Sequence, residues 1–121
     1  MENEGFIKTF QGHSAAKTVH HGFVGGLMEH TLSVTRLCDY MANAYPVLKR
    51  DLLIAAALLH DVGKCQIPDE ILMKPRKLTA QEYSFVKMHA QFGYDILKNQ
   101  DLDIRVKNAA LHHHERCDGT G

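Results

Sequence analysis

The sequence has no excess of either charge, since 14 lysines and arginines balance 14 aspartates and glutamates among 121 residues. This balance gives no bulk electrostatic argument for binding nucleic acid or an anionic membrane. The longest apolar run covers only residues 52–59, which is too short to cross a bilayer. The acidic start, Met-Glu-Asn-Glu, lacks the apolar region of a signal peptide. We therefore expect a soluble, cytoplasmic protein without a membrane segment.

Cysteine is also scarce, and none of the three cysteines stands in a CxxC motif. An odd number of separated cysteines (Cys38, Cys65 and Cys117) indicates neither a disulfide framework nor a zinc ribbon, and it fits a reducing compartment. The chain also lacks internal repeats and low-complexity linkers, and its length suits one hydrophobic core. We expect a single domain over residues 1–121.

The alternation of apolar and polar residues that is typical of strands is absent, and helical spacing takes its place. The stretch 51–60 is apolar nearly all round, which predicts a central core helix that ends near Gly63. Thr79 and Glu82 form a capping-box signature at the start of another helix. The predicted fold class is all-α, with helices at 24–45, 51–60, 80–98 and 103–115 and one helical turn at 69–73.

Histidine is the residue in surplus, with nine in the chain. The pair His60–Asp61 follows directly on the apolar run, and neutral imidazole with carboxylate suits divalent first-row metals. Four further histidines lie where a metal site in a helical bundle could use them. These are His30, His89, His113 and His114.

Other interpretations stand beside the metal site. A histidine in an apolar stripe is often a hydrogen-bonded core residue, which applies to His30 and His89. A carboxylate at a helix C-terminus needs a compensating cation, and for Asp61 this is either a metal or Lys64. His112 is expected to face solvent, since it points away from the direction of its two histidine neighbours.

These residues resemble the HD superfamily of metal-dependent phosphohydrolases. Residues 60–121 are similar to its HD-GYP subgroup, the cyclic di-GMP phosphodiesterases, through His60-Asp61-Val-Gly-Lys64, Ile67-Pro-Asp-Glu-Ile-Leu, Gly93-Tyr-Asp-Ile-Leu97 and His113-His114-Glu-Arg-Cys-Asp-Gly-Thr-Gly121. Residues 14–64 instead resemble the HD domain of bacterial 3′→5′ exoribonucleases, through Val-His-His-Gly-Phe-Val-Gly-Gly-Leu-Met-Glu-His30. The resemblance implies an all-α HD-domain helical bundle, truncated here before its C-terminal helices.

The resemblance also implies a ligand set. His30, His60, Asp61 and His89 would be metal ligands, and His113 and His114 would complete a second metal position. Trinuclear HD-GYP sites have a glutamate at the position of Gly26, so two divalent ions are expected here. Iron or manganese suits these ligands best, and magnesium, nickel, zinc or cobalt are alternatives.

The implied activity is hydrolysis of a cyclic dinucleotide such as cyclic di-GMP by a metal-activated water. Asp61 would bridge the metals, Lys64 would hold a phosphate oxygen or orient the water, and Gly119 and Gly121 would let the backbone approach the phosphates. One alternative is an exoribonuclease-type HD hydrolase that acts on RNA. The other is a non-catalytic HD signalling module. The sequence gives no indication of the oligomeric state.

Overall fold

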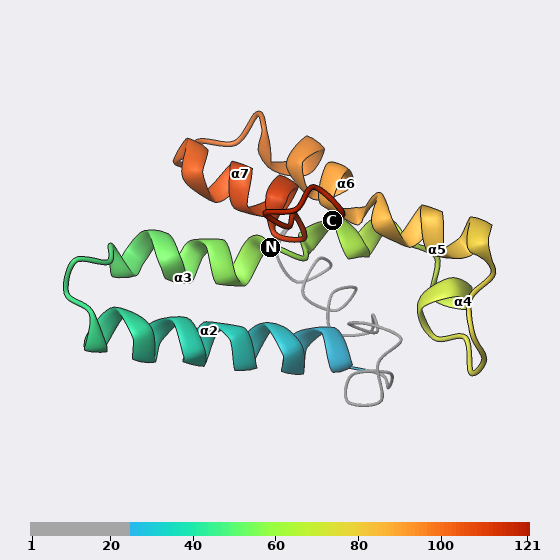
Figure 1. The fold of residues 1–121 in the computed structure, drawn as a ribbon, viewed down its shortest axis with the longest axis horizontal. Helices are drawn as coiled ribbons and strands as arrows, with labels where there is room; N and C mark the ends of the chain where they lie inside the picture. Colours follow the sequence, from blue (N-terminus) through green and yellow to red (C-terminus); the bar gives the residue numbers. More distant parts are fainter. Residues whose placement is uncertain (1–24) are drawn as a thin grey trace, which may run out of the picture.

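The computed structural model describes residues 25–121, and every regular element in that range is helical (Figure 1). The predicted all-α class is therefore confirmed. None of the described helices is both long enough and apolar enough to span a membrane. The elements are α2 (Gly26–Ala44), α3 (Arg50–Leu59), the 3₁₀ helix η1 (Val62–Gln66), α4 (Asp69–Leu72), α5 (Ala80–Lys87), α6 (His89–Leu97) and α7 (Ile104–His112).

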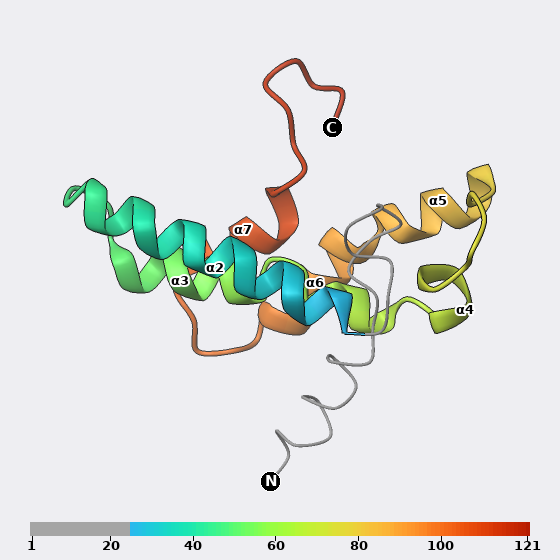
Figure 2. The same cartoon turned by 90° about the horizontal axis from the view of Figure 1, so that it is seen from below.

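The helices pack in a chain of neighbours around η1. α2 packs on α3, α3 also contacts α7, and α6 lies between η1 and α7 (Figures 1 and 2). Val62, Leu97 and Ala110 bring η1, α6 and α7 into one buried cluster. Leu27 forms a second cluster with Met28 and Cys65, which fixes the start of α2 beside η1. This packing draws the start of α2 and the ends of α3 and α7 toward η1.

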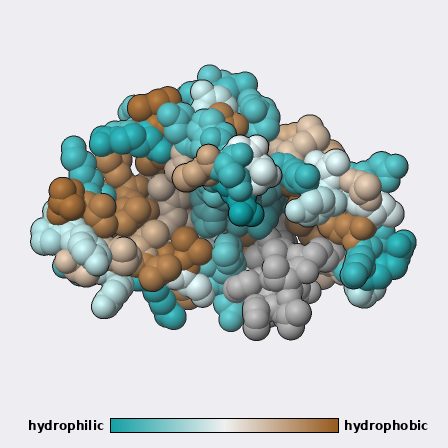
Figure 3. Space-filling model, viewed as in Figure 1, coloured by the Kyte–Doolittle hydropathy of each residue, from teal (hydrophilic) through white to brown (hydrophobic). Residues whose placement is uncertain are grey.

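The central core helix predicted for residues 51–60 is present as α3, but it is less buried than its apolar sequence suggests. Ala57 is its only buried residue, and Leu58 is 48% exposed. Among the described residues, α2 covers one side of α3 and α7 covers another, which leaves the face of Leu58 open. Further apolar residues lie exposed on α2 and in the turn after it, and Figure 3 shows brown side chains gathered over that end of the hairpin. These include Leu37, Met41, Val47 and Leu48.

The continuous helix expected over 80–98 is also wrong, because the chain breaks at Met88 into α5 and α6. The Met88 N–H bonds to the Phe85 carbonyl at 3.0 Å, which closes the last turn of α5 more tightly than an α-helix does. The Val86 carbonyl faces the His89 ring nitrogen Nδ1 at 2.7 Å. The His89 side chain thus binds the Val86 carbonyl, which in a continuous helix would accept only from a backbone N–H.

The last helix ends three residues earlier than predicted, at His112 rather than Glu115. As at Met88, a histidine ring binds a carbonyl at the helix end, because Nδ1 of His113 lies 2.9 Å from the Ala110 carbonyl oxygen. Asp103 caps the start of α7 by accepting a hydrogen bond from the Arg105 N–H. The turn at 69–73 is confirmed as α4. The predicted start at Val24 lies outside the described residues, as do residues 14–23 of the exoribonuclease-like segment.

The capping box predicted at the start of α5 is present. Thr79 accepts from the Glu82 N–H at 3.2 Å, and the Glu82 carboxylate accepts from the Thr79 N–H at 2.7 Å and from the Lys74 ammonium. The lysine and the capping bond lower the pKa of Glu82 to about 2. The capping box thereby joins the loop after α4 to the first turn of α5.

We expect Glu82→Gln to remove part of the acid sensitivity of folding. Because the folded-state pKa of Glu82 lies below its unfolded value of 4.5, its contribution is complete above that pH and is lost as pH falls toward about 2. Urea midpoints of wild type and variant should therefore converge across this window. Thr79→Ala, which removes the cap itself, should cost about 1 kcal/mol at every pH. Parallel pH profiles for wild type and Glu82→Gln would contradict the assignment.

Candidate metal centre

Asp61 lies at the centre of the site, between α3 and η1, and its side chain is only 3% exposed. Its oxygen Oδ1 is 3.2 Å from Nε2 of His89 and 3.3 Å from Nε2 of His113. Its other oxygen, Oδ2, is 3.3 Å from Nε2 of His60 and 3.6 Å from Nε2 of His30. One carboxylate therefore contacts histidines from α2, the end of α3, α6 and the end of α7.

Three of these histidines are held in the same way, each by a carbonyl three residues earlier. Nδ1 of His60 lies 2.7 Å from the Ala57 carbonyl, and His89 and His113 make the equivalent contacts with Val86 and Ala110. Each ring lies just past the end of a helix, where the last carbonyls are available to accept from a side chain. A carbonyl only accepts hydrogen bonds, so Nδ1 must donate. In the neutral imidazole Nε2 is then left with a lone pair.

The Nε2 lone pairs of His89 and His113 point toward each other and toward Asp61. Nε2 of His89 and Nε2 of His113 are 3.2 Å apart, and both face Asp61 Oδ1, a buried oxygen without a hydrogen-bond partner. Three acceptors at hydrogen-bond distance repel one another unless a cation lies among them. The C-terminal ends of α3, α5 and α7 add partial negative charge nearby, which also favours a cation. The donor set therefore fits a divalent metal ion.

Two groups of side chains offer ligand atoms close enough together to hold an ion, and Asp61 belongs to both. The first group combines Asp61 with His89, His113 and His114, and the second combines it with His30 and His60. Nitrogen with carboxylate oxygen is the ligand chemistry of zinc, iron, manganese and similar metals. The cluster can therefore hold a metal ion, and its shared carboxylate allows two adjacent positions.

The ionisation of the site suits a cation. Burial alone would raise the pKa of Asp61, but the contacts with His113, His60 and His89 and the charge of Lys64 hold it well below its usual range. Asp61 is thus a carboxylate at neutral pH. Burial and the neighbouring His113 and His89 lower the pKa of His114 to about 4. A histidine that stays neutral keeps a lone pair available for a metal.

The pKa of His60 is raised, whereas that of His114 is lowered. Burial lowers its pKa, but the hydrogen bond and charge of Asp61 outweigh burial, so the pKa lies above its ordinary value. A more basic ring nitrogen beside a carboxylate attracts a proton or a metal more strongly. The positive charge nearest to the pair is Lys64, whose ammonium donates to Asp61 Oδ2 at 3.0 Å and is buried with it.

The structure brings together every residue that the sequence placed at the metal site. His30, His60, Asp61, His89, His113 and His114 all belong to the two groups, and Lys64 contacts Asp61. Glu29 is exposed and belongs to neither group. His112 pairs with Glu115 at the surface, as expected. Sequence reasoning missed the carbonyls that orient the rings. Their signal was present as a fixed spacing of three residues between Ala57 and His60, Val86 and His89, and Ala110 and His113.

Gly63 does not end the helix, contrary to the prediction, but lies inside η1. A Cβ at this position would be 1.8 Å from the His89 carbonyl oxygen and 2.4 Å from the Gly93 N. On α6, Gly93 also lacks a side chain at this contact, and a Cβ there would lie 3.3 Å from the Gly63 N. The two glycines therefore allow η1 and α6 to approach each other closely. This contact sets the distance between Asp61 and His89.

A comparison with known proteins shows which family has this arrangement. The HD domain family profile matches residues 27–120, which span the whole site. The chain belongs to the HD domain family. The name of the family fits the His60–Asp61 pair, and the match confirms the resemblance seen in the sequence.

Curated relatives of this HD domain include the 3′3′-cGAMP-specific phosphodiesterase 2 of Vibrio cholerae, 38% identical over 96 residues, which cover 76% of this chain and 18% of the relative. A cyclic di-GMP phosphodiesterase of Pseudomonas aeruginosa is 49% identical over 67 residues, or 54% of this chain and 16% of the relative. The 3′-5′ exoribonuclease YhaM of Listeria innocua is 47% identical over 55 residues, or 46% of this chain and 18% of the relative. The chain spans less than a quarter of the length of these proteins.

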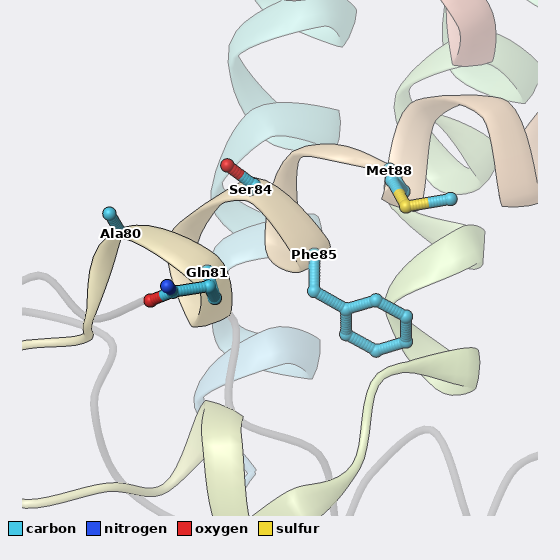
Figure 4. A pocket seen from close by; sticks show the side chains of 5 residues that line it. All are labelled: Ala80, Gln81, Ser84, Phe85 and Met88. Atoms are coloured by element: carbon cyan, nitrogen blue, oxygen red, sulfur yellow. The ribbon is translucent and has the colours of Figure 1, made fainter.

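Two hollows lie near α5, and only one of them reaches the metal-site residues. The first is lined by Ala80, Gln81, Ser84, Phe85 and Met88, which carry no ionisable group (Figure 4). The second has a volume of about 780 Å³ and shares Lys64, His89 and His114 with the site. The second cavity is therefore the one through which a ligand would reach the HD domain's cluster.

Proposed function

We propose that this HD domain is a metal-dependent phosphodiesterase that hydrolyses a cyclic dinucleotide such as cyclic di-GMP. The observation that carries the proposal is the position of Asp61, whose two oxygens face two separate groups of histidines. A carboxylate shared in this way is suited to two adjacent divalent ions. Two ions a few ångströms apart activate a water and stabilise the charge that develops on a departing phosphate oxygen.

The proposed ligands follow from the two groups. His89, His113 and His114 with Asp61 would hold one ion, and His30 and His60 with the other oxygen of Asp61 would hold the second. Iron or manganese is the proposed metal, because both accept mixed imidazole and carboxylate ligands. The backbone carbonyls behind His60, His89 and His113 keep each Nε2 aimed inward, which leaves little reorganisation for binding.

Lys64 is proposed to act on the substrate side of Asp61. Lys64 is only 7% exposed, its ammonium contacts Asp61 Oδ2, and the residue lines the cavity that leads to His89 and His114. A fixed positive charge at that position would hold a nonbridging phosphate oxygen or orient the attacking water. The hydrogen bond to Asp61 fixes the direction in which this ammonium points.

The substrate class is supported by the relatives and by the tail of the chain. Several relatives are named for cyclic di-GMP or 3′3′-cGAMP. The last residues of the HD-GYP-like part line the cavity, namely His114, Glu115, Arg116, Thr120 and Gly121. An exoribonuclease activity is the second candidate, supported by the similarity to the Listeria innocua enzyme. Zero net charge offers no extended attraction for an RNA strand, so the cyclic dinucleotide is preferred.

Metal content and substrate choice test the proposal together. We expect the chain to bind two ions and to hydrolyse cyclic di-GMP faster than a short RNA, measured by elemental mass spectrometry and chromatography of the products. His113→Ala should lose metal and activity, since it removes one of the ligands of the first group. His112→Ala is the matched control, because this neighbouring ring points to Glu115 at the surface.

Each failure has a distinct meaning. Hydrolysis of RNA without hydrolysis of the cyclic dinucleotide would support the exoribonuclease alternative. Metal binding with turnover of neither substrate would indicate the non-catalytic signalling module. Equal metal content in His113→Ala and His112→Ala would remove His113 from the ligand set.

A further inference from the structure

The cavity beside the metal centre is larger than a single phosphate requires. Its volume of about 780 Å³ lies within the range typical of pockets for small organic ligands. One end is formed by the metal-site residues Lys64, His89 and His114, and the lining then continues along α5 to Tyr83 and Lys87. A substrate that places a phosphodiester at the cluster would therefore have room for a second chemical group beyond it.

The far part of the cavity combines an apolar wall with an aromatic ring and cations. Leu72, which is buried, with Leu78 and Val86 supplies the apolar wall, and Tyr83 adds an aromatic face. The Lys87 ammonium lies over the Tyr83 ring, 4.8 Å from its centroid, as a cation–π pair one turn apart on α5. This pair places a flat π surface and a positive charge on the same side of the cavity.

Another part of the cavity is lined by the segment after α7, which rises on the same side of the molecule as α5 (Figure 2). It contributes Arg116, which lies 3.7 Å from Asp118, and Glu115, whose carboxylate pairs with His112. The lining carries the cations Lys64, Lys87 and Arg116 and the carboxylate of Glu115. Lys64 and Arg116 also contact carboxylates, those of Asp61 and Asp118, whereas Lys87 lies over the Tyr83 ring, where it can attract an anionic group of a ligand.

We infer that Tyr83 and Lys87 form a subsite for the half of a dinucleotide that is not cleaved, with the nucleobase stacked on Tyr83 and Lys87 beside its phosphate. This inference rests on the proposed function, because it names the part of the substrate that lies outside the metal centre. A nucleobase is flat and aromatic and stacks on tyrosine, and a phosphate supplies the negative charge that Lys87 and Arg116 attract. Tyr83 would act as a specificity-determining residue rather than as part of the chemistry.

Assays with two substrates distinguish base stacking on Tyr83 from a general effect of its substitution on the metal centre. Cyclic di-GMP contains both halves, whereas bis(p-nitrophenyl) phosphate offers only a phosphodiester with small aryl groups. For the manganese-loaded chain, Tyr83→Ala should raise KM for cyclic di-GMP by about tenfold or more, as expected for a lost base stack. Hydrolysis of bis(p-nitrophenyl) phosphate should stay within about twofold of wild type, since the metal centre is unchanged.

Conservative and control variants sharpen the test. Tyr83→Phe should keep the wild-type KM, because the ring remains. Lys87→Ala should raise KM for cyclic di-GMP, and the increase should shrink at high salt. Gln81→Ala is the matched control, since Gln81 lies on the same helix but lines the other hollow (Figure 4). Tyr83 is 56% exposed, so its truncation leaves the core unchanged.

An unchanged KM for cyclic di-GMP in Tyr83→Ala would overturn the inference, as would an effect of Lys87→Ala alone, which would mean a phosphate contact without stacking. If wild type hydrolyses bis(p-nitrophenyl) phosphate but does not bind cyclic di-GMP, the subsite is refuted and the phosphodiesterase chemistry stands. If wild type hydrolyses neither compound, the proposed function fails as well.

Discussion

Asp61→Asn is expected to abolish hydrolysis and to remove metal from both groups of ligands at once. The substitution keeps the shape of the side chain but removes the charge that both groups share. The loss of metal affinity should exceed the roughly 10- to 100-fold effect of removing an outer-shell partner. Elemental mass spectrometry of the purified variant, followed by assays with added manganese, measures both effects.

Asp61→Asn leaves the buried Lys64 without its carboxylate partner, so a control must separate this loss of stability from the loss of metal. Lys64 is buried beside Asp61, and removing one partner of a buried ion pair typically costs about 3–5 kcal/mol. The double variant Asp61→Asn/Lys64→Met should recover much of that stability in denaturant titrations while remaining without metal. Full metal content in either variant would show that Asp61 is not a ligand.

Gly63→Ala is expected to destabilise the fold strongly. Its Cβ would lie 1.8 Å from the His89 carbonyl oxygen, which belongs to the backbone of α6 and cannot rotate away. Relief requires η1 and α6 to separate, so the contact between Asp61 and His89 should be disturbed together with the core. We expect a loss of more than about 4 kcal/mol, at the far end of the range for point mutations.

Gly119→Ala provides the comparison, since it adds the same methyl group where no atom lies within 4 Å. Its cost should be limited to the positive φ of 75° at Gly119, about 1–2 kcal/mol for a residue with a side chain. Urea unfolding followed by circular dichroism compares the two variants. A cost for Gly63→Ala no larger than that for Gly119→Ala would contradict the tight contact between η1 and α6.

The sequence predicted the helices and the metal-site residues better than the helix ends. Helical spacing revealed each long element, and the His60–Asp61 pair on an apolar run indicated the site. The boundaries at Lys87 and His112 were missed because propensity favours continuation there. These two helix ends depend on histidine rings, those of His89 and His113, that bond to backbone carbonyls. Such contacts depend on the three-dimensional placement of the side chains, which the sequence pattern does not give.

The burial of α3 was also beyond the sequence. Residues 52–59 are apolar on every side, which is a property of the chain, whereas burial depends on how many neighbours are present. Among the described residues, α2 and α7 make the main contacts with this helix, and Leu58 stays 48% exposed. The role of Gly63 was missed for a similar reason, since a close approach between η1 and α6 arises from tertiary packing.

The spread of the proposed ligands along the chain also connects the metal to the lifetime of the protein. His30 and His114 are separated by most of the described chain, yet both contact the cluster through Asp61 or His89. An ion that binds only the folded state stabilises it in proportion to the logarithm of its concentration, by about 4 kcal/mol at a thousandfold excess over Kd. Scarcity of metal would therefore increase the fraction of unfolded chains that proteases degrade. The abundance of the protein would then follow the metal supply of the cell before any change in catalytic rate.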